Sequence, residues 1–482
     1  MAAALLRVNK IARLIAGICC SIGASLVAQS MPAGSTALSP ADNIQSIVNS
    51  SPAGTTFMLL PGVYRMQTIT PKNNDAFVGQ GTVVLNGSQV LSPSPDPEGS
   101  GMWIATAVPA RYESSIGKCQ VDHPLCLMPQ DLFIDNVLQT PASAIQGLHP
   151  GSWFFDVDHS RLYIPTNPTG HVVELGMKSF AFLGGAAGVK VSNLIVEKYA
   201  TPAHYGAVGA NKAGNGWVLN HVEARWNHAL GIKTGPDSQI MNSFLHDNGQ
   251  EGVDCGPANC RVIKNEISWN NYAGFATDDE GGGAKFGATT NLLVQSNYIH
   301  DNRGTGLWDD TNCVGTVFDR NTIVNNQRQG IQHEISYNAV ISNNVVKDNG
   351  NTSTGGLWNA QILIQQSSNV EVFGNTVEIP ARGGNGIVLM NGNRGSGILG
   401  PYITAKNRIH NNTITYLGAS GYSGMEDSRK DNTAIRNSFY SNRYIFLIGN
   451  SNSAHWMWPW PTPMSWKAFQ ATGQEVHGKC CR

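Results

Sequence analysis

The chain has 482 residues, a formal net charge of −1, and only 13% of its residues are charged. This length allows one large domain or two. The low charge, without any basic run, excludes the phosphate-neutralising surface of a nucleic-acid-binding protein. Glycine is abundant, at 53 residues, which is typical of a fold with many tight turns.

The N-terminus has the order of a secretory signal peptide. Arg7, Lys10 and Arg13 form a basic start, residues 14–28 are apolar but too few to span a bilayer comfortably, and small residues follow. We expect residues 1–28 to be removed and the protein to be secreted or periplasmic, with no membrane attachment after cleavage. A short uncleaved anchor is the alternative.

The next two regions differ in character. The segment ADNIQSIVNSS, residues 41–51, predicts a short amphipathic helix that caps the core within an N-terminal region of first coils, residues 36–98. Residues 99–177 are rich in Trp, Phe and Pro and break the rhythm that follows. We expect them to form an inserted small β-domain or long loops.

Export would permit disulfides. Seven cysteines follow the signal: Cys119, Cys126, Cys255, Cys260, Cys313, Cys480 and Cys481. The first four form two pairs that are close enough in sequence to staple short loops. Cys313 could tie the tail through Cys480 or Cys481, which would leave one thiol over, and the spacing does not decide the connectivity of these three cysteines. The spacings match no zinc-binding pattern.

From about residue 190 the chain repeats a phrase, as in NSFLHDNGQEGV, NEISWNNYAGF, NYIHDNRGTGL and NTIVNNQRQGI. The shortest steps are 22 to 24 residues, for example from Asn220 to Asn242 and from Asn297 to Asn321. A fixed period of this size indicates a stacked solenoid. The asparagines that begin the units, which we expect to stack in a ladder, are Asn193, Asn220, Asn242, Asn265, Asn297, Asn321, Asn344, Asn375 and Asn412.

Runs within each unit, such as LLVQSNYI and AVISNNVV, alternate in a way that predicts strands rather than helices. A helical repeat would not tolerate a glycine and two asparagines per turn. We therefore predict an all-β fold, a right-handed parallel β-helix over residues 178–450, interrupted by the inserted β-domain. The aromatic tail, residues 451–482, is expected to pack on the solenoid.

The glycine of each unit aligns the residues that follow it. The sequences IK, VD, AK, LWDD and IQHE follow Gly231, Gly252, Gly283, Gly306 and Gly330. One face of five consecutive coils would then carry Lys233, Asp254, Lys285, Asp309 or Asp310, and His333 or Glu334. A solvated strip that neutralises itself is the structural alternative. The bulky Trp308 within the strip and the long loops beside it favour a groove.

Two carboxylates of this strip have a catalytic spacing. Asp310 and Glu334 are 24 residues apart, which is one coil. Adjacent coils are about 4.8 Å apart, so the two carboxyl groups should lie roughly 5 to 6 Å apart. Retaining glycosidases separate nucleophile and acid/base by about 5 to 5.5 Å, whereas inverting enzymes need roughly 6.5 to 9.5 Å. Close like charges also push the two pKa values apart, so that one group is ionised and the other protonated.

The sequence GLWDD, followed one coil later by HE, resembles the motif pair of the β-helix glycosidases of glycoside hydrolase family 120, the β-xylosidases. There, a Gly-aliphatic-Trp-any-Asp turn carries the nucleophile and the next coil carries an acid/base glutamate. The resemblance implies that Asp310 is the nucleophile and Glu334 the acid/base. An inserted β-domain before the coils also agrees with it. The residues that flank Glu334 differ from that family, so the substrate is not carried over.

Further residues are candidates for substrate binding: Trp308, Asp309, His333, Lys285, Asp254, Lys233 and Trp358. The two tryptophans could stack on sugar faces or pack in the core, and the histidine could bind a hydroxyl or serve the structure. Asp278, Asp279 and Glu280, in the glycine-rich insertion, could bind sugar hydroxyls or calcium, or form a solvated loop. The predicted chemistry on a poly- or oligosaccharide requires no cofactor and no assigned metal ligand, with structural or substrate-bridging calcium as the alternative.

Two other functions compete with the glycosidase. The sequence GGGAKFG resembles the turn that carries the basic lysine in pectate lyases of polysaccharide lyase family 9. Lys285 would then act as the base of a lyase or epimerase on uronates, with calcium neutralising the substrate. Lys233, Lys285 and Arg328 are few cations for such a groove. A non-catalytic carbohydrate-binding solenoid is the third possibility, and the sequence indicates no oligomeric state.

Overall fold

The computed structural model describes residues 34–106, 108, 114–211, 213–350, 356–428, 436–448, 453–459 and 462–481. The predicted signal peptide, residues 1–28, lies outside this part of the chain. Among the described residues, no helix has the length and apolarity needed to cross a membrane.

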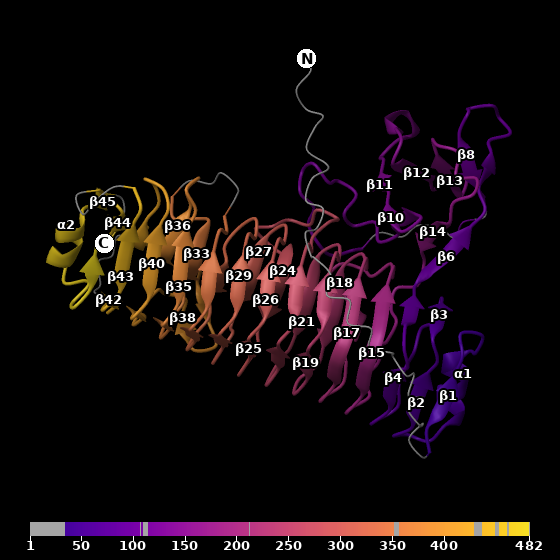
Figure 1. Cartoon of the computed structure of the whole chain (residues 1–482), viewed down its shortest axis with the longest axis horizontal. Helices are drawn as coiled ribbons and strands as arrows, with labels where there is room; N and C mark the ends of the chain where they lie inside the picture. The colour runs from indigo at the N-terminus through magenta and orange to yellow at the C-terminus, as the bar shows by residue number, and fades with distance from the viewer. Residues whose placement is uncertain are drawn as a thin grey trace, which may run out of the picture. The chain divides into compact units, whose positions relative to one another are not determined.

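The chain forms a right-handed parallel β-helix, which confirms the predicted fold class (Figure 1). A typical coil contains β25 (Leu293–Gln295), β26 (Tyr298–His300) and β27 (Thr305–Asp310), and each of these strands pairs in parallel with its counterpart one coil later. The period of the sequence is therefore the length of one coil.

One wall of the solenoid is an 11-stranded sheet in which β27 is the fifth strand, and this sheet carries the predicted charged strip. Its other strands are β16 (Gly206–Val208), β18 (Leu230–Thr234), β21 (Glu251–Cys255), β24 (Gly282–Gly287), β30 (Ile331–Glu334), β33 (Ala360–Gln365), β36 (Asn385–Asn391), β41 (Ser423–Asp427), β44 (Trp456–Met457) and β45 (Pro463–Met464).

The other walls form a 24-stranded sheet. Besides β25 and β26 it contains β1 (Thr36–Leu38), β2 (Thr56–Leu59), β3 (Gly62–Arg65), β4 (Ala76–Gly79), β5 (Val83–Asn86), β15 (Lys190–Glu197), β17 (Val218–Arg225), β19 (Gln239–Met241), β20 (Phe244–His246), β22 (Arg261–Ile263), β23 (Glu266–Ser268), β28 (Val317–Asp319), β29 (Thr322–Val324), β31 (Val340–Ser342), β32 (Val345–Lys347), β34 (Glu371–Phe373), β35 (Thr376–Ile379), β39 (Arg408–His410), β40 (Thr413–Tyr416), β42 (Ser438–Tyr440), β43 (Arg443–Phe446) and β46 (Lys479–Cys480).

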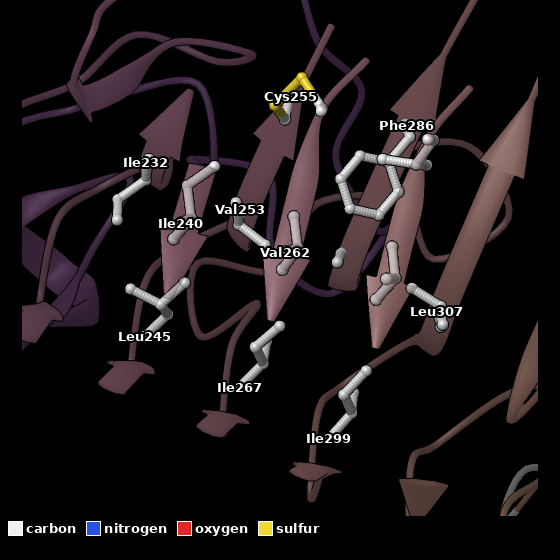
Figure 2. Close-up of a cluster of buried hydrophobic side chains, with 14 of the residues drawn as sticks. Ile232, Ile240, Leu245, Val253, Cys255, Val262, Ile267, Phe286, Ile299 and Leu307 are labelled. Carbon is white, nitrogen blue, oxygen red and sulfur yellow. A yellow bond between two sulfur atoms is a disulfide. The ribbon is translucent and has the colours of Figure 1, made fainter. Parts of the chain in front are cut away.

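The core fills the inside of the coils because alternate residues of every strand point inward. Figure 2 shows Val253 of one wall facing Val262 and Ile267 of the other two. All three side chains are fully buried. Residues of the same type repeat at the same position one coil later, so the core is a stack of similar layers rather than a single cluster.

Asparagine ladders close the corners of the coils. Asn265 donates through Nδ2 to Oδ1 of Asn297, and the same bond continues through Asn321, Asn344, Asn375 and Asn412. These six asparagines stack as expected and satisfy backbone groups that would otherwise be unpaired. The three earlier ones, Asn193, Asn220 and Asn242, lie outside the ladder: Ser243, one residue after Asn242, takes the place opposite Asn265.

The N-terminal end is capped by α1 (Ile44–Ser50), whose Asn43 side chain accepts from the backbone N–H of Ser46. Ile44 and Val48 of this helix are buried against the first coils. The helix thus covers apolar side chains that no preceding coil could cover, as the sequence predicts.

The insertion forms two small sheets beside the first coils. One contains β6 (Ser88–Leu91), β9 (Leu132–Ile134), β10 (Val137–Leu138) and β14 (Val173–Gly176), and the other β7 (Ser94–Pro95), β8 (Trp103–Ala105), β11 (Thr140–Pro141), β12 (Ser152–Asp156) and β13 (Arg161–Ile164). A short 3-10 helix, η1 (Ile145–Gly147), lies between β11 and β12. The insertion begins at β6, before the predicted boundary at residue 99. A separate two-stranded ribbon, β37 (Ser396–Gly397) and β38 (Gly400–Pro401), comes from a later loop.

The aromatic tail continues the solenoid. Its β44 extends the 11-stranded sheet, its β46 pairs with β43, and α2 (Trp466–Ala471) follows β45. Trp456 and Phe469 are fully buried in the main core. The tryptophans of the tail thus close the C-terminal end as α1 closes the other.

The structure confirms the disulfides Cys119–Cys126 and Cys255–Cys260. The possible bridge from Cys313 to the tail is not formed: this thiol is free and fully buried, and Cys480 is bonded to Cys481. Cys313 follows β27, whereas Cys480 lies in β46, many coils away. A solenoid brings together only neighbouring coils, so the tail cannot reach the middle of the stack.

Peptide mapping of the non-reduced protein is expected to recover the Cys119–Cys126 and Cys255–Cys260 bridges and to find Cys313 unmodified by alkylating reagents until the protein is denatured. The reason for the last result is that Cys313 has no exposed surface and burial raises the pKa of its thiol to about 12, so the reactive thiolate is suppressed. Rapid labelling of Cys313 in the native protein would contradict its place in the core.

Candidate active site

The 11-stranded sheet sets the alignment of the predicted charged strip. Lys233 is the register partner of Asp254, Lys285 of Trp308, and Asp310 of Glu334. Asp310 is two residues beyond Trp308 on β27, so both side chains project from the same face of the strand. The strip is therefore formed, with the two candidate catalytic acids stacked on adjacent coils.

Asp310 and Glu334 line one cavity of about 460 Å³ on the outer face of this sheet. The other lining residues are Thr277, Asp278, Asp279, Lys285, Trp308, Arg328, Gln332, Trp358, Gln365 and Arg394. They come from the strands β24, β27, β30 and β33 and from the loops beside them. The cavity thus brings together five of the predicted site residues: Asp310, Glu334, Lys285, Trp308 and Trp358. Asp278 and Asp279 of the acidic insertion line it as well.

Each of the two acids has its own cation. The Lys285 ammonium lies 2.9 Å from Oδ2 of Asp310 and 3.8 Å from the centre of the Trp308 ring. The Arg394 guanidinium lies 2.7 Å from Oε1 of Glu334. The site therefore keeps two like charges on neighbouring coils by pairing each with an opposite one, as their proximity requires.

The environment of Glu334 raises the pKa of its carboxyl group. The side chain is almost completely buried. Burial first, and then the negative charge of Asp310, raise the pKa of Glu334 above its ordinary value, while Arg394 and Lys285 oppose this shift. Gln332 donates from Nε2 to the second oxygen of Glu334 at 2.7 Å. The carboxyl group is thus held in place and has the raised pKa of a general acid.

The two neighbours of the acids point the other way. Asp309 and His333 have no exposed surface, and Nδ1 of His333 lies 2.7 Å from Oδ1 of Asp309 inside the solenoid. The Thr316 hydroxyl donates to the other oxygen of Asp309 at 2.7 Å. These positions correct the prediction that Asp309 and His333 bind substrate: adjacent residues of a strand face opposite sides, and Asp310 and Glu334 take the outer side.

The start of the strip lies outside the cavity. Lys233 and Asp254 form an ion pair of 3.0 Å, and neither lines the cavity. Their predicted contact with substrate is therefore not seen at this site. Glu251, on the same strand as Asp254, is buried and accepts from the backbone N–H of Lys285, and burial raises its pKa well above the ordinary value.

The acidic insertion forms one side of the cavity. Asp278 and Asp279 line it, and the Asp279 carbonyl oxygen accepts a hydrogen bond from the Lys285 ammonium. Glu280 is buried and lies 2.5 Å from Nε2 of His204, so it is not part of one ligand set with the two aspartates. No group of three or more His, Cys, Asp or Glu side chains in the described part of the chain is arranged to hold a metal ion.

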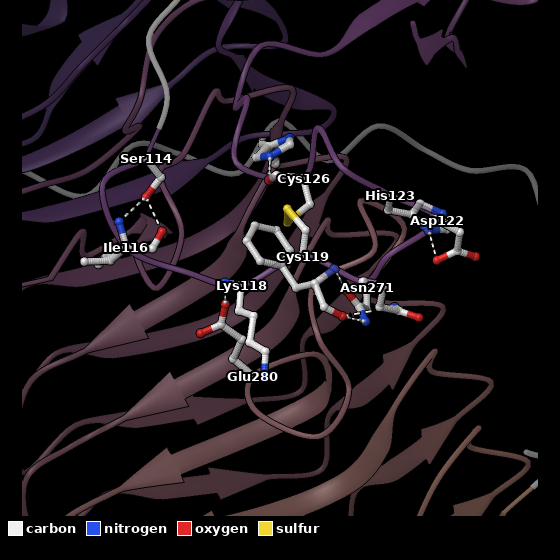
Figure 3. The surroundings of a disulfide bond; sticks show 12 residues. Ser114, Ile116, Lys118, Cys119, Asp122, His123, Cys126, Asn271 and Glu280 are labelled. Carbon is white, nitrogen blue, oxygen red and sulfur yellow. Dashed lines mark hydrogen bonds and ion pairs between the residues drawn. A yellow bond between two sulfur atoms is a disulfide. The ribbon is translucent and has the colours of Figure 1, made fainter. Parts of the chain in front are cut away.

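The inserted domain fixes this acidic loop. Figure 3 shows the Cys119–Cys126 bridge beside Asn271 and Glu280. The Lys118 backbone N–H donates to Glu280, and Gln120 donates from Nε2 to the Phe275 carbonyl oxygen at 3.0 Å. The loop that forms one side of the cavity is therefore anchored by the insertion, although the two are more than a hundred residues apart in sequence.

A larger cavity of about 510 Å³ lies between the insertion and the coils. Its buried carboxylate, Asp131, already accepts from the Tyr272 hydroxyl at 2.6 Å and lies 2.9 Å from Nδ1 of His228. Its other acid, Asp122, is exposed and lies beside His123. Because this cavity offers no pair of stacked acids, the smaller one is the better candidate for catalysis.

Comparison with known proteins supports the β-helix architecture independently. Residues 206–377 match the family model described as a right-handed β-helix region. The matched part contains both Asp310 and Glu334. No curated protein matches the chain.

Among solved structures, the β-helix is similar to that of XylC in complex with xylose, with a TM-score of 0.68 and 14% identity over 91% of this chain and 82% of that one. It is also similar to the A-module of the mannuronan C-5 epimerase AlgE4 from Azotobacter vinelandii, with a TM-score of 0.51 and 14% identity over 88% of this chain and 96% of the other. At this identity the similarity shows a shared fold.

Four residues of the β-helix cavity escape sequence analysis, and one of them, Thr277, directly precedes Asp278 in the acidic insertion. Gln332 and Gln365 are register neighbours of Trp308 and Glu334, and alignment by glycines could have identified them as outward-facing polar residues. Arg394 comes from a loop after β36, 60 residues from its partner Glu334. No repeat or motif marks this arginine in the sequence.

Proposed function

We propose that the chain is a retaining glycoside hydrolase that uses Asp310 as nucleophile and Glu334 as acid/base. The observation that supports this most strongly is the register of Asp310 with Glu334 on adjacent coils, facing one cavity. Coils about 4.8 Å apart give the close carboxyl spacing of a retaining enzyme, which leaves no room for a water between the two groups.

In the first step the carboxylate of Asp310 attacks the anomeric carbon, and the proton of Glu334 goes to the leaving oxygen. The ion pair with Lys285 stabilises Asp310 as a carboxylate, which is the form a nucleophile needs. A covalent glycosyl ester of Asp310 results.

Formation of this ester also prepares the second step. Esterification removes the negative charge of Asp310, which is one cause of the raised pKa of Glu334. With that charge gone and Arg394 still in place, the pKa of Glu334 falls and the carboxylate can take a proton from the incoming water. The same residue thus changes from acid to base when its neighbour becomes neutral.

The substrate class is proposed as a saccharide. The XylC structure, of the same fold, is a complex with xylose. Trp308 and Trp358 in the cavity provide ring faces on which a sugar could stack. Thr277, Gln332 and Gln365 add neutral groups that can bind hydroxyls.

The competing lyase or epimerase requires Lys285 as an amine base. Lys285 is instead engaged as a cation, with its ammonium on Asp310 and over the Trp308 ring. Both interactions are strongest for the protonated ammonium, which has no lone pair with which to accept a proton from a substrate. The geometry therefore supports Lys285 as a partner of the nucleophile.

The proposal is tested by product analysis on neutral and uronate glycans, with calcium or with a chelator. Proton NMR is expected to show a new reducing end that first appears with the anomeric configuration of the substrate, at a rate that does not depend on calcium. Inversion at the anomeric carbon would contradict Asp310 as nucleophile, and an unsaturated product would establish the lyase.

Replacing Arg394 with glutamine is expected to move the alkaline limb of the pH profile of kcat/KM upward by about one unit. Arg394 lowers the pKa of Glu334, so its loss lets that pKa rise further. The acid form then persists to higher pH, and activity is lost later as pH increases. Arg382→Gln is the matched control, because Arg382 pairs with Asp348 outside the cavity at similar exposure. An unmoved alkaline limb would contradict Glu334 as the acid.

We also propose that the protein functions outside the cytoplasm. The two loop-closing disulfides are stable in oxidising compartments and rare in the cytosol. They agree with the signal-peptide pattern of residues 1–28.

A further inference from the structure

Two aromatic side chains away from the cavity are unusually exposed. Trp269 and Tyr298 have exposed fractions of 44% and 45%, and every other described aromatic residue is at least partly buried. They lie on neighbouring coils, since β23 pairs with β26. Both rings also contact His300, with centroids 5.1 Å and 4.0 Å away. The only strongly exposed aromatic residues of the described chain thus form one cluster.

The cluster is part of a repeated arrangement. Tyr298 stacks on His300, whose ring nitrogens lie 2.6 Å from Asp301 and 3.3 Å from Glu266. Each imidazole nitrogen therefore has a carboxylate partner, and the aromatic ring covers one side of the imidazole.

The same unit occurs two coils earlier. There Phe244 stacks on His246 at 3.6 Å, and His246 lies 2.7 Å from Asp247 and 3.3 Å from Glu223. Phe244 and Tyr298 share one register row, with Glu266 between them. The two rings are thus separated by two coil spacings, about 9 to 10 Å.

This surface is separate from the candidate active site. Its residues belong to β17, β20, β23 and β26 of the 24-stranded sheet and to the turns that follow. The cavity is lined from the 11-stranded sheet and its loops, and none of the cluster residues contributes to it. The catalytic chemistry proposed above makes no use of these residues.

We propose that this surface is a second carbohydrate-binding site, which holds a neutral polysaccharide along the direction in which the coils stack. The proposal rests on the proposed function for the choice of a glycan. Exposed aromatic rings offer apolar faces for the C–H side of sugar rings, and the adjacent carboxylates offer acceptors for the hydroxyls. The repeat of the unit along the stack suits an extended ligand that itself repeats.

The charges of the surface decide between classes of glycan. Four carboxylates, those of Glu223, Asp247, Glu266 and Asp301, surround the two imidazoles. Arg225 is engaged by Glu197 and Glu223. A polymer of uronates would meet this excess of negative charge and be repelled. The ligand is therefore a neutral polysaccharide. This surface could hold the polymer on the solenoid while the cavity stays unoccupied.

The test is native affinity electrophoresis of the full chain in gels containing arabinoxylan, galactomannan or mixed-linkage glucan, with polygalacturonate as the acidic comparison. Asp310→Asn is used as the background so that the polymer is not degraded. Trp269→Ala and Tyr298→Ala are each expected to weaken retention on at least one neutral polymer by about tenfold, the size of one lost aromatic contact. Tyr298→Phe should restore it. Tyr440→Ala is the matched control, because Tyr440 stacks on His410 but is half-buried.

Unfolding midpoints and light scattering accompany the gels. Retention that is unchanged in the Trp269→Ala/Tyr298→Ala double variant would place all binding in the cavity and overturn the proposal. An equal loss of retention with Tyr440→Ala, or retention by polygalacturonate alone, would also overturn it. A change of oligomeric state without a change of retention would show instead that the surface is a contact between copies of the chain. Failure of the proposed hydrolase is seen separately, either because the unsubstituted protein cleaves none of these glycans or because the Asp310→Asn protein still cleaves them.

Discussion

Alanine in place of Asp310 is expected to lower turnover on every substrate by at least about 10⁴-fold, as the loss of a nucleophile does in other enzymes. Alanine in place of Glu334 should behave differently. Loss of a general acid costs about 10² to 10⁴ in rate, and the cost depends on how much the leaving group needs the proton. Nitrophenyl glycosides, whose leaving groups need little help, should therefore retain activity in Glu334→Ala.

Azide separates the two roles further. In Glu334→Ala the glycosyl ester on Asp310 forms from an activated substrate but has no base to activate water. Azide is a small anion that attacks without a base, so it should speed turnover and give a glycosyl azide with the configuration of the substrate. The measurement is the rate of nitrophenol release with and without azide, together with NMR of the product. Asp310→Ala should show no such acceleration by this route.

Two controls guard against a general effect of mutation. Glu426→Ala removes a partly buried carboxylate from the same sheet, outside the cavity, and should leave these rates nearly unchanged. Lys285→Ala should weaken binding without erasing the chemistry. If instead Lys285→Ala is dead and Asp310→Ala still releases an unsaturated product from a uronate polymer, the lyase is correct and the glycosidase is wrong.

The stacking of the two acids could be predicted from the sequence because, in a solenoid, residues that are one sequence period apart lie at the same position of adjacent coils. A step of 24 residues from Asp310 to Glu334 predicts adjacent coils, and the register agrees. The same logic identifies Lys285 and Trp308 as neighbours. The period carries no such information for Arg394, which belongs to a loop that has no counterpart on other coils.

The sequence analysis misplaced Asp309 and His333 because it used the alignment of glycines without also using the alternation of side chains along a strand. The glycine alignment brought Asp309 and His333 to the right coils, but only strict alternation from Trp308 shows that Asp309 faces inward while Asp310 faces outward. Charged side chains are seldom fully buried, so the sequence analysis considered both aspartates as residues of the outer face. Inside the solenoid Nδ1 of the imidazole and the Thr316 hydroxyl bind the two oxygens of Asp309, so the carboxylate could be buried.

This buried pair leads to the largest expected loss of stability. Asp309→Ala would leave the His333 imidazole without its carboxylate and the Thr316 hydroxyl without its acceptor, both in the core. Removing one partner of a buried pair typically costs about 3 to 5 kcal/mol. The position adds to the effect, because the pair bridges β27 and β30, the two strands that carry Asp310 and Glu334. Chemical denaturation should show the loss, and hydrogen exchange should show it first in the amides of these two strands.

The double replacement Asp309→Leu/His333→Leu is expected to be less destabilising than Asp309→Ala, because the imidazole is then no longer left unpaired in the core and only the Thr316 hydroxyl still lacks its acceptor. Asp348→Ala serves as the surface control: its ion pair with Arg382 is exposed on both sides, and such pairs contribute only about 0 to 1 kcal/mol. If Asp309→Ala costs no more than Asp348→Ala, the pair does not stabilise the coils. If these losses follow the expected order, the buried pair stabilises the arrangement of the two outward-facing acids. Asp309 and His333, the residues beside the proposed catalytic acids, then join β27 to β30 from within and fix the spacing on which the proposed retaining chemistry depends.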